Sequence, residues 1–221
     1  MGVTTEKRVV RRGSQSLLPL YRVMRCQYGH PRNQWGLWCK RRKTLAEKEE
    51  IIIGAILTQR TNWRNVELSI TALKRVRAGR LKNLYKLAQK NPNKLADIIR
   101  SCGFYQTKVK YLRAVTGFFV KNGGLKPISK WPLNKLRVAL LELHGVGPET
   151  ADSILLYALN KPIFVVDEYT RRLIKRKNFV VPSLSYDHLQ RFFMERLPKD
   201  YRLYQDFHAI IVVDGKNTGR P

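Results

Sequence analysis

The residues with the clearest chemistry lie in a tight turn between two predicted helices at about 132–143 and 148–159. Gly145 and Gly147 flank Val146, and Pro148 stands at the first-turn position that proline favours in a helix. The two glycines allow positive φ and let a ligand approach the backbone closely. Free N–H groups at the start of the second helix favour an anion. The turn therefore predicts either an anion site or a plain helical hairpin with a glycine turn.

A second candidate is Asp167, which closes the apolar run Phe164–Val166 and precedes a predicted helix at 168–177. A carboxylate in this position is stabilised by the helix dipole and accepts hydrogen bonds from the first backbone N–H groups. Most aspartates in such a setting are simple N-caps. The local pattern alone therefore predicts no more than a cap.

The elements that must position these residues are predicted to be helical. Thr44, with Glu47 three residues later, forms a capping box that opens an apolar helix. Apolar residues then recur at three-to-four spacing at about 63–77, 80–89, 93–101, 105–121, 132–143, 148–159, 168–177, 185–196 and 200–213. Only Pro162–Val166 has strand character, and its position between two helices favours a buried connector. The fold class is predicted to be all-α.

The charge balance indicates a polyanionic partner. The 221 residues include 43 Lys and Arg against 16 Asp and Glu, which gives a formal net charge of +27. Such a charge attracts phosphates without regard to sequence. The basic residues are spread along the chain, which disfavours a membrane-surface protein, and no apolar run approaches the ~18 residues of a membrane span.

The cysteines and the N-terminus bear on localisation and on domain boundaries. Three cysteines at irregular spacing favour a reducing compartment, and no secretory segment follows Met1, so we expect a cytoplasmic (nucleoid) or nuclear protein. Residues 1–45 contain a single acid, Glu6, among many basic residues. We expect residues 1–16 to be a disordered basic tail, because a like-charged polar stretch buries too little apolar surface to offset its ordering entropy.

Together, the hairpin and the aspartate resemble the helix-hairpin-helix/Gly-Pro-Asp superfamily of DNA glycosylases. The superfamily pattern LxGVGxxTAxxIL fits Leu143–Leu155, and VDxxxxR fits Val166–Arg172. Asp167 lies 18 residues after Glu149, which is the superfamily's spacing between lysine and aspartate. Residues 55–66 and 103–110 resemble two further segments of the family. The superfamily resemblance runs from about Trp35 to the C-terminus. Ile56–Trp63 and Gly145–Leu155 look most like the 3-methyladenine DNA glycosylase III branch, a cluster-free relative of endonuclease III.

The resemblance implies a two-domain fold with an active-site cleft between the domains. Residues 44–159 would form a six-helix barrel that carries the hairpin at 141–159. Residues 17–43 and 160–221 would form a second helical domain from the two terminal segments. The stretch from 208 to 219 resembles the approach to the iron–sulfur loop of endonuclease III, but Gly219 stands where the first cluster cysteine would be. No iron–sulfur cluster and no other cofactor is expected, since a cluster needs four thiolates.

The resemblance also implies a reaction. A glycosylase extrudes the damaged nucleotide into a pocket, and Asp167 would stabilise the oxocarbenium character left on the sugar and orient the attacking water. Bifunctional members use a lysine at the position of Glu149 to form a Schiff base. A carboxylate cannot form an imine, so we expect a monofunctional enzyme in which water is the nucleophile.

The base pocket is expected to contain aromatic residues. Trp63 matches a base-stacking position of the alkyladenine branch, and Trp35 and Trp38 resemble its paired tryptophans, although core packing would explain them as well. Aromatic faces attract cations, so these residues favour a cationic alkylated base such as 3-methyladenine. Some relatives carry a pocket lysine where this chain has Ile210.

DNA contacts are expected on both sides of this pocket. Gln59 would fill the gap left by the extruded base, while Arg60 and Lys108 would contact the DNA backbone. At the hairpin, the expected DNA-binding residues are Gly145, Val146, Gly147 and Thr150. The backbone carbonyls of Leu141, Leu143 and Val146 resemble those that bind a Na⁺ or K⁺ ion bridging to phosphate.

The expected partner is double-stranded DNA with a damaged base, bound by a monomer. Three alternatives stay open. One is a bifunctional glycosylase/lyase like endonuclease III, against which Glu149 and the missing cluster both count. Another is a mismatch uracil or thymine glycosylase, which also lacks the lysine. The last is a non-catalytic DNA-binding hairpin protein, which would have no reason to keep an aspartate at this spacing.

Overall fold

The structure, a computed structural model, describes residues 16–219. Within this range every regular element is a helix, so the all-α prediction is confirmed. In chain order the elements are α1 (Leu17–Tyr28), α2 (Gln34–Trp38), α3 (Leu45–Leu57), α4 (Trp63–Arg75), α5 (Leu81–Lys90), α6 (Pro92–Ile98), η1 (Arg100–Cys102), α7 (Tyr105–Lys121), α8 (Leu125–Ser129), α9 (Leu133–Leu141), α10 (Pro148–Ser153), η2 (Ile154–Ala158), α11 (Glu168–Arg176), α12 (Tyr186–Arg196) and α13 (Tyr201–Asn217). Nearly all of the basic tail expected at 1–16 lies outside the described residues.

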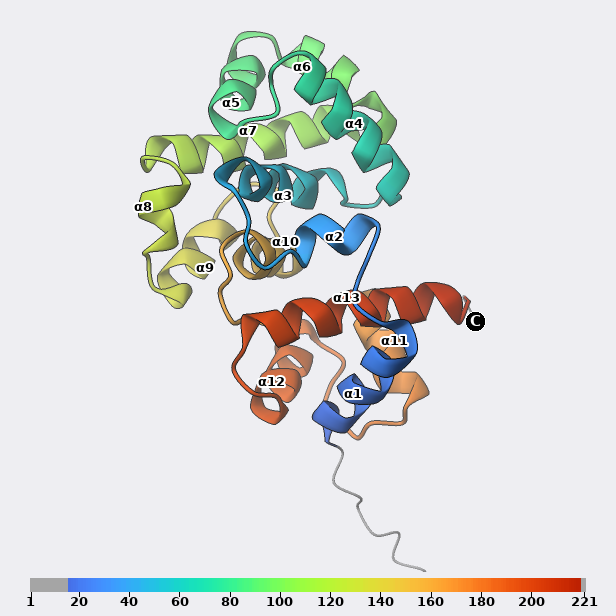
Figure 1. Ribbon diagram of the computed structural model, residues 1–221. Helices are drawn as coiled ribbons and strands as arrows, with labels where there is room; N and C mark the ends of the chain where they lie inside the picture. The colour runs from blue at the N-terminus through green and yellow to red at the C-terminus, as the bar shows by residue number, and fades with distance from the viewer. Residues whose placement is uncertain (1–15, 220–221) are drawn as a thin grey trace, which may run out of the picture.

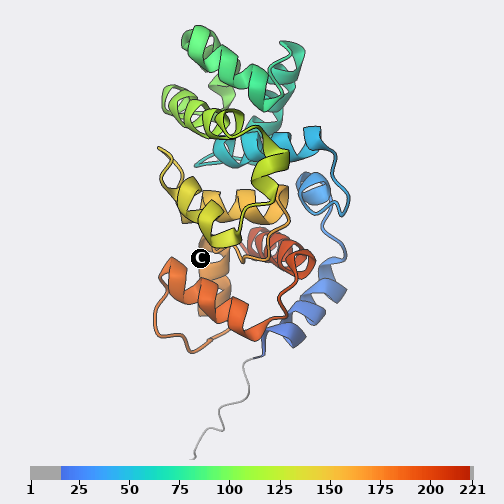
Figure 2. The same ribbon diagram turned by 90° about the vertical axis from the view of Figure 1, so that its left-hand side faces the viewer.

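The helices gather toward the two ends of an elongated molecule, with the hairpin between them. α4, α5, α6 and α7 lie at one end, and α1, α11 and α12 lie at the other (Figures 1 and 2). α13 crosses the middle and packs against α11, α1 and η2, so the first helix lies beside the last ones. The N-terminal and C-terminal segments thus lie side by side as expected. The exact division into domains stays a prediction.

Local signals in the sequence account for where the main helices begin. The capping box of α3 is formed, because Glu47 N donates to Thr44 Oγ1 at 3.3 Å and Thr44 N donates to Glu47 Oε2 at 2.7 Å. Residues 51–57 of this helix are all buried, which makes α3 the central helix of its half of the molecule. Pro148 begins α10. Residues 163–166 form the buried, strand-free connector that the sequence predicts.

One predicted helix is divided in two. The segment 148–159 begins as α10 but continues as a wide π-helical turn, η2, in which Leu159 N donates to Ile154 O at 3.2 Å. A π-turn inserts one residue into a helix and rotates the side chains that follow. The aromatic ring of Tyr157 is in consequence fully buried against α13 and α2.

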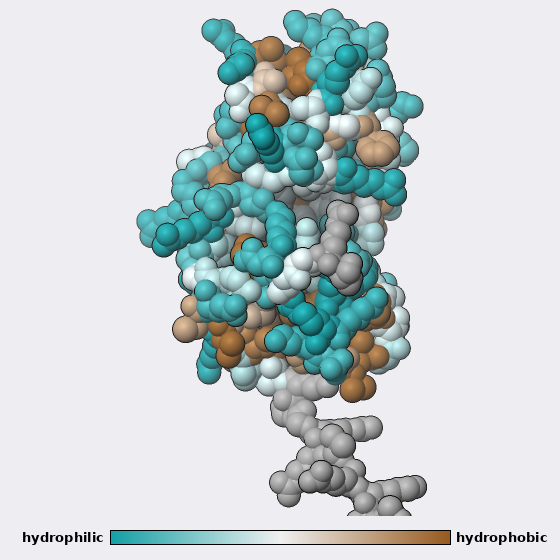
Figure 3. Space-filling model, turned by 90° about the vertical axis from the view of Figure 1, so that its right-hand side faces the viewer, coloured by the Kyte–Doolittle hydropathy of each residue, from teal (hydrophilic) through white to brown (hydrophobic). Residues whose placement is uncertain are grey.

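The apolar pattern did not delimit the 12-residue helix α1 or the two five-residue helices α2 and α8. The predicted helix at 93–101 ends instead in the 3₁₀ turn η1. No helix within residues 16–219 has the length and apolar character needed to cross a bilayer. The face that carries α4, α11 and the end of α13 is mostly hydrophilic, with apolar residues scattered over it (Figure 3).

Candidate active site

A pocket of about 550 Å³ lies between the two ends of the molecule. It is lined by residues from five parts of the chain: Gln34, Trp35 and Trp38 of α2, residues 58 and 60–63 after α3, Glu149 and Ser153 of α10, Asp167 and Tyr169 at the start of α11, and His208, Val212 and Lys216 of α13. Both predicted catalytic carboxylates and all three predicted pocket tryptophans are among them. The structure thus brings together residues that are up to 182 positions apart.

Asp167 is a buried carboxylate whose two oxygens have different surroundings. Oδ1 accepts hydrogen bonds from Thr170 N at 2.7 Å and Thr170 Oγ1 at 2.9 Å, so the residue is the N-cap of α11. Oδ2 lies 3.5 Å from Nε2 of His208. Burial opposes ionisation, but the His208 ring and the Thr170 hydrogen bonds outweigh it and lower the pKa of Asp167. The carboxylate is therefore held in its anionic form inside a pocket.

Glu149 lines the same pocket and has the opposite electrostatic environment. Desolvation and the negative charge of Asp167 raise the pKa of Glu149, although its side chain lies at the exposed mouth of the pocket. Two carboxylates whose pKa values are pushed apart can serve as one anion and one proton-carrying group. No lysine occupies the hairpin position of Glu149.

The aromatic side chains form a connected wall. The ring of Trp38 makes edge-to-face contacts with Trp35 and Trp63, with centroid distances of 5.9 Å and 5.8 Å. Trp35 and Trp38 are nearly buried and also line the pocket, so they belong to the core and to the pocket wall at once, and their contact with a flipped base stays a prediction. Nε1 of Trp35 is buried and has no hydrogen-bond partner among the described residues. The pocket therefore offers a π-surface, while Nε1 of Trp35 is enclosed behind it.

The hairpin next to this pocket is held in place by side chains from two other elements. Gln59 Nε2 donates to Gly145 O and to Thr150 Oγ1, each at 3.0 Å. Gly145 has φ +83°, and the ring of Tyr111 lies directly against its Cα. A second hollow of about 600 Å³ runs between this hairpin, Gln59 and the turn that bears Phe104.

The backbone groups proposed for a cation are in the expected turn. The carbonyl of Leu143 accepts a hydrogen bond from Val146 N at 3.0 Å, and the side chain of Val146 is buried. A cation that used the Leu143 carbonyl would share that oxygen with the turn. Binding of Na⁺ or K⁺ by the carbonyls of Leu141, Leu143 and Val146 stays a prediction.

Comparison with known proteins identifies the family. Residues 53–199 match the HhH-GPD superfamily of base excision DNA repair proteins. A "Putative DNA repair glycosylase" of Methanocaldococcus jannaschii is 39% identical over 201 residues, which cover 90% of this chain and 86% of that protein. The chain belongs to the HhH-GPD superfamily. It is accordingly a DNA glycosylase of base excision repair.

Two further relatives place this glycosylase within the superfamily. Endonuclease III of Thermotoga maritima is 27% identical over 172 residues, covering 77% of this chain and 74% of that protein. The crystal structure of the Helicobacter pylori 3-methyladenine DNA glycosylase bound to 1,N6-ethenoadenine superposes with a TM-score of 0.74. Its sequence identity is 28%, and the match covers 93% of this chain and 98% of that one.

One expected DNA contact of the glycosylase is wrong. Lys108 is 1% exposed, and its ammonium group donates to Leu57 O at 2.8 Å and to Cys102 O at 2.7 Å. The charge thus satisfies carbonyls at the end of α3 and in η1, and it is not available to a DNA phosphate. Exposed lysines and this buried one cannot be told apart from residue type alone.

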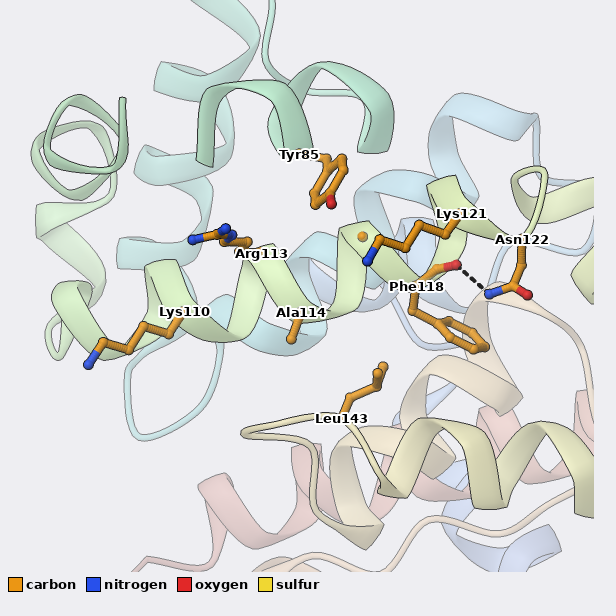
Figure 4. A pocket seen from close by; sticks show the side chains of 9 residues that line it. Tyr85, Lys110, Arg113, Ala114, Phe118, Lys121, Asn122 and Leu143 are labelled. Carbon is orange, nitrogen blue, oxygen red and sulfur yellow. Dashed lines mark hydrogen bonds between the residues drawn. The ribbon is translucent and has the colours of Figure 1, made fainter. Parts of the chain in front are cut away.

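A third hollow lies on α7, away from Asp167. Figure 4 shows Lys110, Arg113 and Lys121 projecting from α7, with Leu143 of the hairpin facing that helix. We call these three cations the α7 basic stripe. Tyr85 packs against α7 beside Gly117, where an added Cβ would lie 2.8 Å from its ring. The stripe gives the glycosylase a basic surface next to the hairpin.

Several site residues were missed in the sequence. His208 and Lys216 lie within the apolar pattern of α13, Tyr157 is placed by the π-turn, and Phe104 is 63% exposed with φ +47° beside the second hollow. The available signal for His208 was a polar residue within the apolar run Phe207–Val213 of this helix. Lys216 lines the pocket although Ile210, the position of the family's pocket lysine, is buried and does not line it.

Proposed function

We propose that this glycosylase is monofunctional and hydrolyses the N-glycosidic bond of an alkylated base that has been flipped out of double-stranded DNA. The observation that carries the proposal is the buried, anionic Asp167 in a tryptophan-lined pocket whose hairpin has Glu149 in place of lysine. The enzyme would need no cofactor, would act as a monomer and would work where DNA is kept, in the nucleoid or the nucleus.

Asp167 supplies the electrostatic part of the reaction. As the base departs, positive charge develops on the sugar, and a fixed carboxylate in a water-poor site stabilises that charge. Oδ1 is held by Thr170, which leaves Oδ2 for the sugar and for the attacking water. Glu149, with its raised pKa, can carry a proton toward the departing base or accept one from the water.

The pocket walls favour a flat, electron-poor base. Trp63 stands at the mouth, where its Nε1 donates to Glu67 at 2.8 Å, and Trp35 and Trp38 stand deeper. Alkylated purines such as 3-methyladenine are cationic, so they gain from π-faces and are good leaving groups.

DNA binding would involve the hairpin and the loops around it. The N–H groups at Gly147 and at the start of α10 would bind a phosphate. Arg60 lines both hollows on either side of this hairpin and has φ +52°, and Gln59 is already tethered to Gly145. Gln59 would fill the space of the flipped base, which requires exchange of its present hydrogen bonds.

The proposal is tested with a panel of duplexes that carry single alkylated, oxidised or deaminated bases, scored for alkali-dependent cleavage. Asp167→Asn should lower base release by at least about 10²-fold while preserving the N-cap, because asparagine also caps helices. Glu168→Gln, the same change one residue later at an exposed side chain, is the matched control and should have no effect.

Three results, one from borohydride trapping and two from this panel and from DNA-binding measurements, would overturn parts of the proposal. Borohydride should not trap the protein on DNA; trapping would mean that a lysine forms an imine, and Lys216 would be the first to replace. Release of uracil or thymine alone would identify a mismatch glycosylase. DNA binding without release of any base would identify a non-catalytic hairpin protein.

A further inference from the structure

His208 occupies a position that the reaction described above does not use. Its ring is 5% exposed and lines the pocket beside Asp167. Nδ1 lies 2.7 Å from the hydroxyl of Tyr157, whereas Nε2 is buried and has no partner other than the 3.5 Å contact with Oδ2 of Asp167. The ring of Trp35 packs edge-on against the imidazole. A buried ring nitrogen without a hydrogen-bond partner destabilises the fold, so its presence calls for an explanation.

The hydroxyl of Tyr157 decides which ring nitrogen of His208 carries a proton. It lies within hydrogen-bond distance of two acceptors, His208 Nδ1 at 2.7 Å and the carbonyl of Gln205 at 3.3 Å. When the imidazole is neutral and its proton lies on Nε2, the hydroxyl donates to Nδ1. When the imidazole is charged, Nδ1–H donates to the hydroxyl oxygen and the hydroxyl donates to Gln205.

Both charge states therefore leave an N–H on Nε2, facing Asp167. The remaining tautomer, with the proton on Nδ1 and a lone pair on Nε2, would place that lone pair against a carboxylate oxygen and is disfavoured. Burial raises the pKa of Tyr157 well above its ordinary value, so its hydroxyl keeps its proton throughout the working range of the enzyme.

We propose that Tyr157 and His208 form a relay that keeps an N–H group at Oδ2 of Asp167 in either charge state, which makes His208 a positioning residue for the catalytic carboxylate. The inference rests on the function proposed above for Asp167. The relay restrains Oδ2 from the side of α13 while Thr170 restrains Oδ1 from α11. The contact of 3.5 Å is long enough for Oδ2 also to accept a water molecule or to approach the sugar.

Other titratable groups face the relay and bear on its pH dependence. Glu149 faces it from α10, Tyr169 lines the same pocket from α11, and Lys216 does so from α13. Cys39, near Tyr157, has a pKa raised to about 12 by burial and stays neutral. Asp206, on the turn of α13 before His208, is already paired with Arg41 at 2.5 Å. Glu149 is thus the group whose titration most needs to be separated from that of Asp167.

Loss of the relay should act mainly in acid. The His208 N–H lowers the pKa of Asp167, and burial raises it. Without this N–H, the effect of burial on Asp167 is less well balanced, so the pKa of Asp167 rises. On acidification, activity is then lost at a higher pH. A neighbouring charge or donor shifts a carboxyl pKa by about one unit or more, so the acid limb should move up by about one pH unit.

The test measures single-turnover release of 3-methyladenine from dimethyl sulfate-treated duplex DNA across pH, with spontaneous release subtracted. His208→Leu and Tyr157→Phe should slow release progressively more as the pH falls below about 5, and for a one-unit rise the extra loss approaches tenfold only below about pH 4, where Asp167 is largely protonated in wild type and variant alike. His208→Gln, which keeps an N–H donor at a similar reach, should recover most of the acid limb. Repeating the series with Glu149→Gln separates the two carboxylates.

Tyr204→Phe is the matched control. Tyr204 is also fully buried, but its hydroxyl has no hydrogen-bond partner among the described residues, so its removal should leave the profile unchanged. Thermal unfolding of each variant shows whether it is folded. If His208→Leu and Tyr157→Phe lower the rate equally at every pH, the relay does not act on Asp167 and the inference fails.

A second measurement does not depend on activity. Long-range ¹H–¹⁵N correlation spectra report which nitrogen of each histidine ring carries the proton. His208 should show a protonated Nε2 at every pH in the wild-type protein, and it should lose this preference in Tyr157→Phe. A Nδ1-protonated tautomer in the wild type would overturn the relay. If no DNA releases a base, the proposed function fails while these spectra still decide the relay.

Discussion

Replacing Gly145 with alanine should damage the hairpin in two ways that the structure separates. Its φ of +83° lies in the left-handed region, which costs a residue with a Cβ about 1–2 kcal/mol. The added Cβ would also lie 2.0 Å from Cδ1 of Tyr111, a distance that requires the ring or the turn to shift. The ring also packs edge-on against His144 of the same turn, so the added methyl group would push the turn and the ring of α7 apart.

The expected cost can be divided between these effects. Gly145→Ala should lower the free energy of unfolding by about 2–4 kcal/mol, with strain and steric overlap contributing similar amounts. Adding Tyr111→Ala to the Gly145→Ala variant removes the overlap but not the strain. In the Tyr111→Ala background, Gly145→Ala should therefore lower the free energy of unfolding by only about 1–2 kcal/mol.

Gly147→Ala provides the contrasting variant two residues away. Gly147 has φ −88°, and no atom lies within 4 Å of an added Cβ, so its replacement should change the free energy of unfolding by less than about 0.5 kcal/mol. The methyl group would instead stand in the space that a phosphate needs at the start of α10. We expect Gly147→Ala to weaken DNA binding about tenfold or more with folding intact.

Urea denaturation and fluorescence anisotropy with a labelled duplex measure the two quantities on the same preparations. The reasoning is refuted if Gly147→Ala binds DNA as tightly as the wild type, because the open space at Gly147 would then not be a phosphate site. It is also refuted if Gly145→Ala is as stable as the wild type. In that case the contact between Gly145 and Tyr111 would not restrain the turn.

Two further predictions concern the basic residues. Lys108→Met should lower the free energy of unfolding in urea by about 1–3 kcal/mol, because the carbonyls of Leu57 and Cys102 would be left without their buried donor. An unchanged midpoint would mean that water or another donor replaces the ammonium group. Changing the three cations of the α7 basic stripe to glutamine should reduce the slope of log Kd against log salt by about 0.9 for each DNA phosphate that the stripe neutralises, as measured by DNA titration at several ionic strengths. Lys199→Gln, at an exposed lysine between α12 and α13, should leave the slope unchanged, and an equal slope for the stripe variant would remove α7 from the DNA path.

The sequence was most informative where chemistry depends on short-range pattern. The capping box at Thr44, the glycine turn at 145–147 and the N-cap at Asp167 are each determined by a few neighbouring residues, and each is present in the structure. The 18-residue interval from Glu149 to Asp167 also agrees with the structure, in which the two residues line one pocket.

The sequence was least informative where a residue's role depends on distant segments. Lys108 resembles any other lysine until the end of α3 and the turn η1 enclose it. Tyr157 would point elsewhere in a regular α-helix, and only the π-turn brings it to His208. In the sequence His208 is only a polar residue within the apolar run Phe207–Val213. Its partners Asp167 and Tyr157 lie 41 and 51 positions earlier, so no local pattern points to them.

Buried polar contacts, in addition to apolar packing, hold the helices around the site together. Asp152 of α10 accepts a two-point contact from Arg137 of α9, at 2.8 Å and 3.1 Å, and further bonds from Tyr186 and Gln190 of α12. The second helix of the hairpin is thus fixed to its first helix, α9, and to α12. A polar network of this kind is geometrically specific, since each partner must be met or its desolvation is uncompensated.

This specificity has a consequence for base flipping. The hairpin is tied by Asp152 on one side and by Gln59 on the other, and Oδ1 of Asp167 is tied by Thr170, so most of the site is already in place without DNA. A preorganised site lowers the barrier because little reorganisation is needed during the reaction. Deformation should therefore fall mainly on the DNA. In the proposed reaction Gln59 would exchange its two hydrogen bonds for contacts in the duplex, so we expect it to be the side chain of the enzyme that moves most.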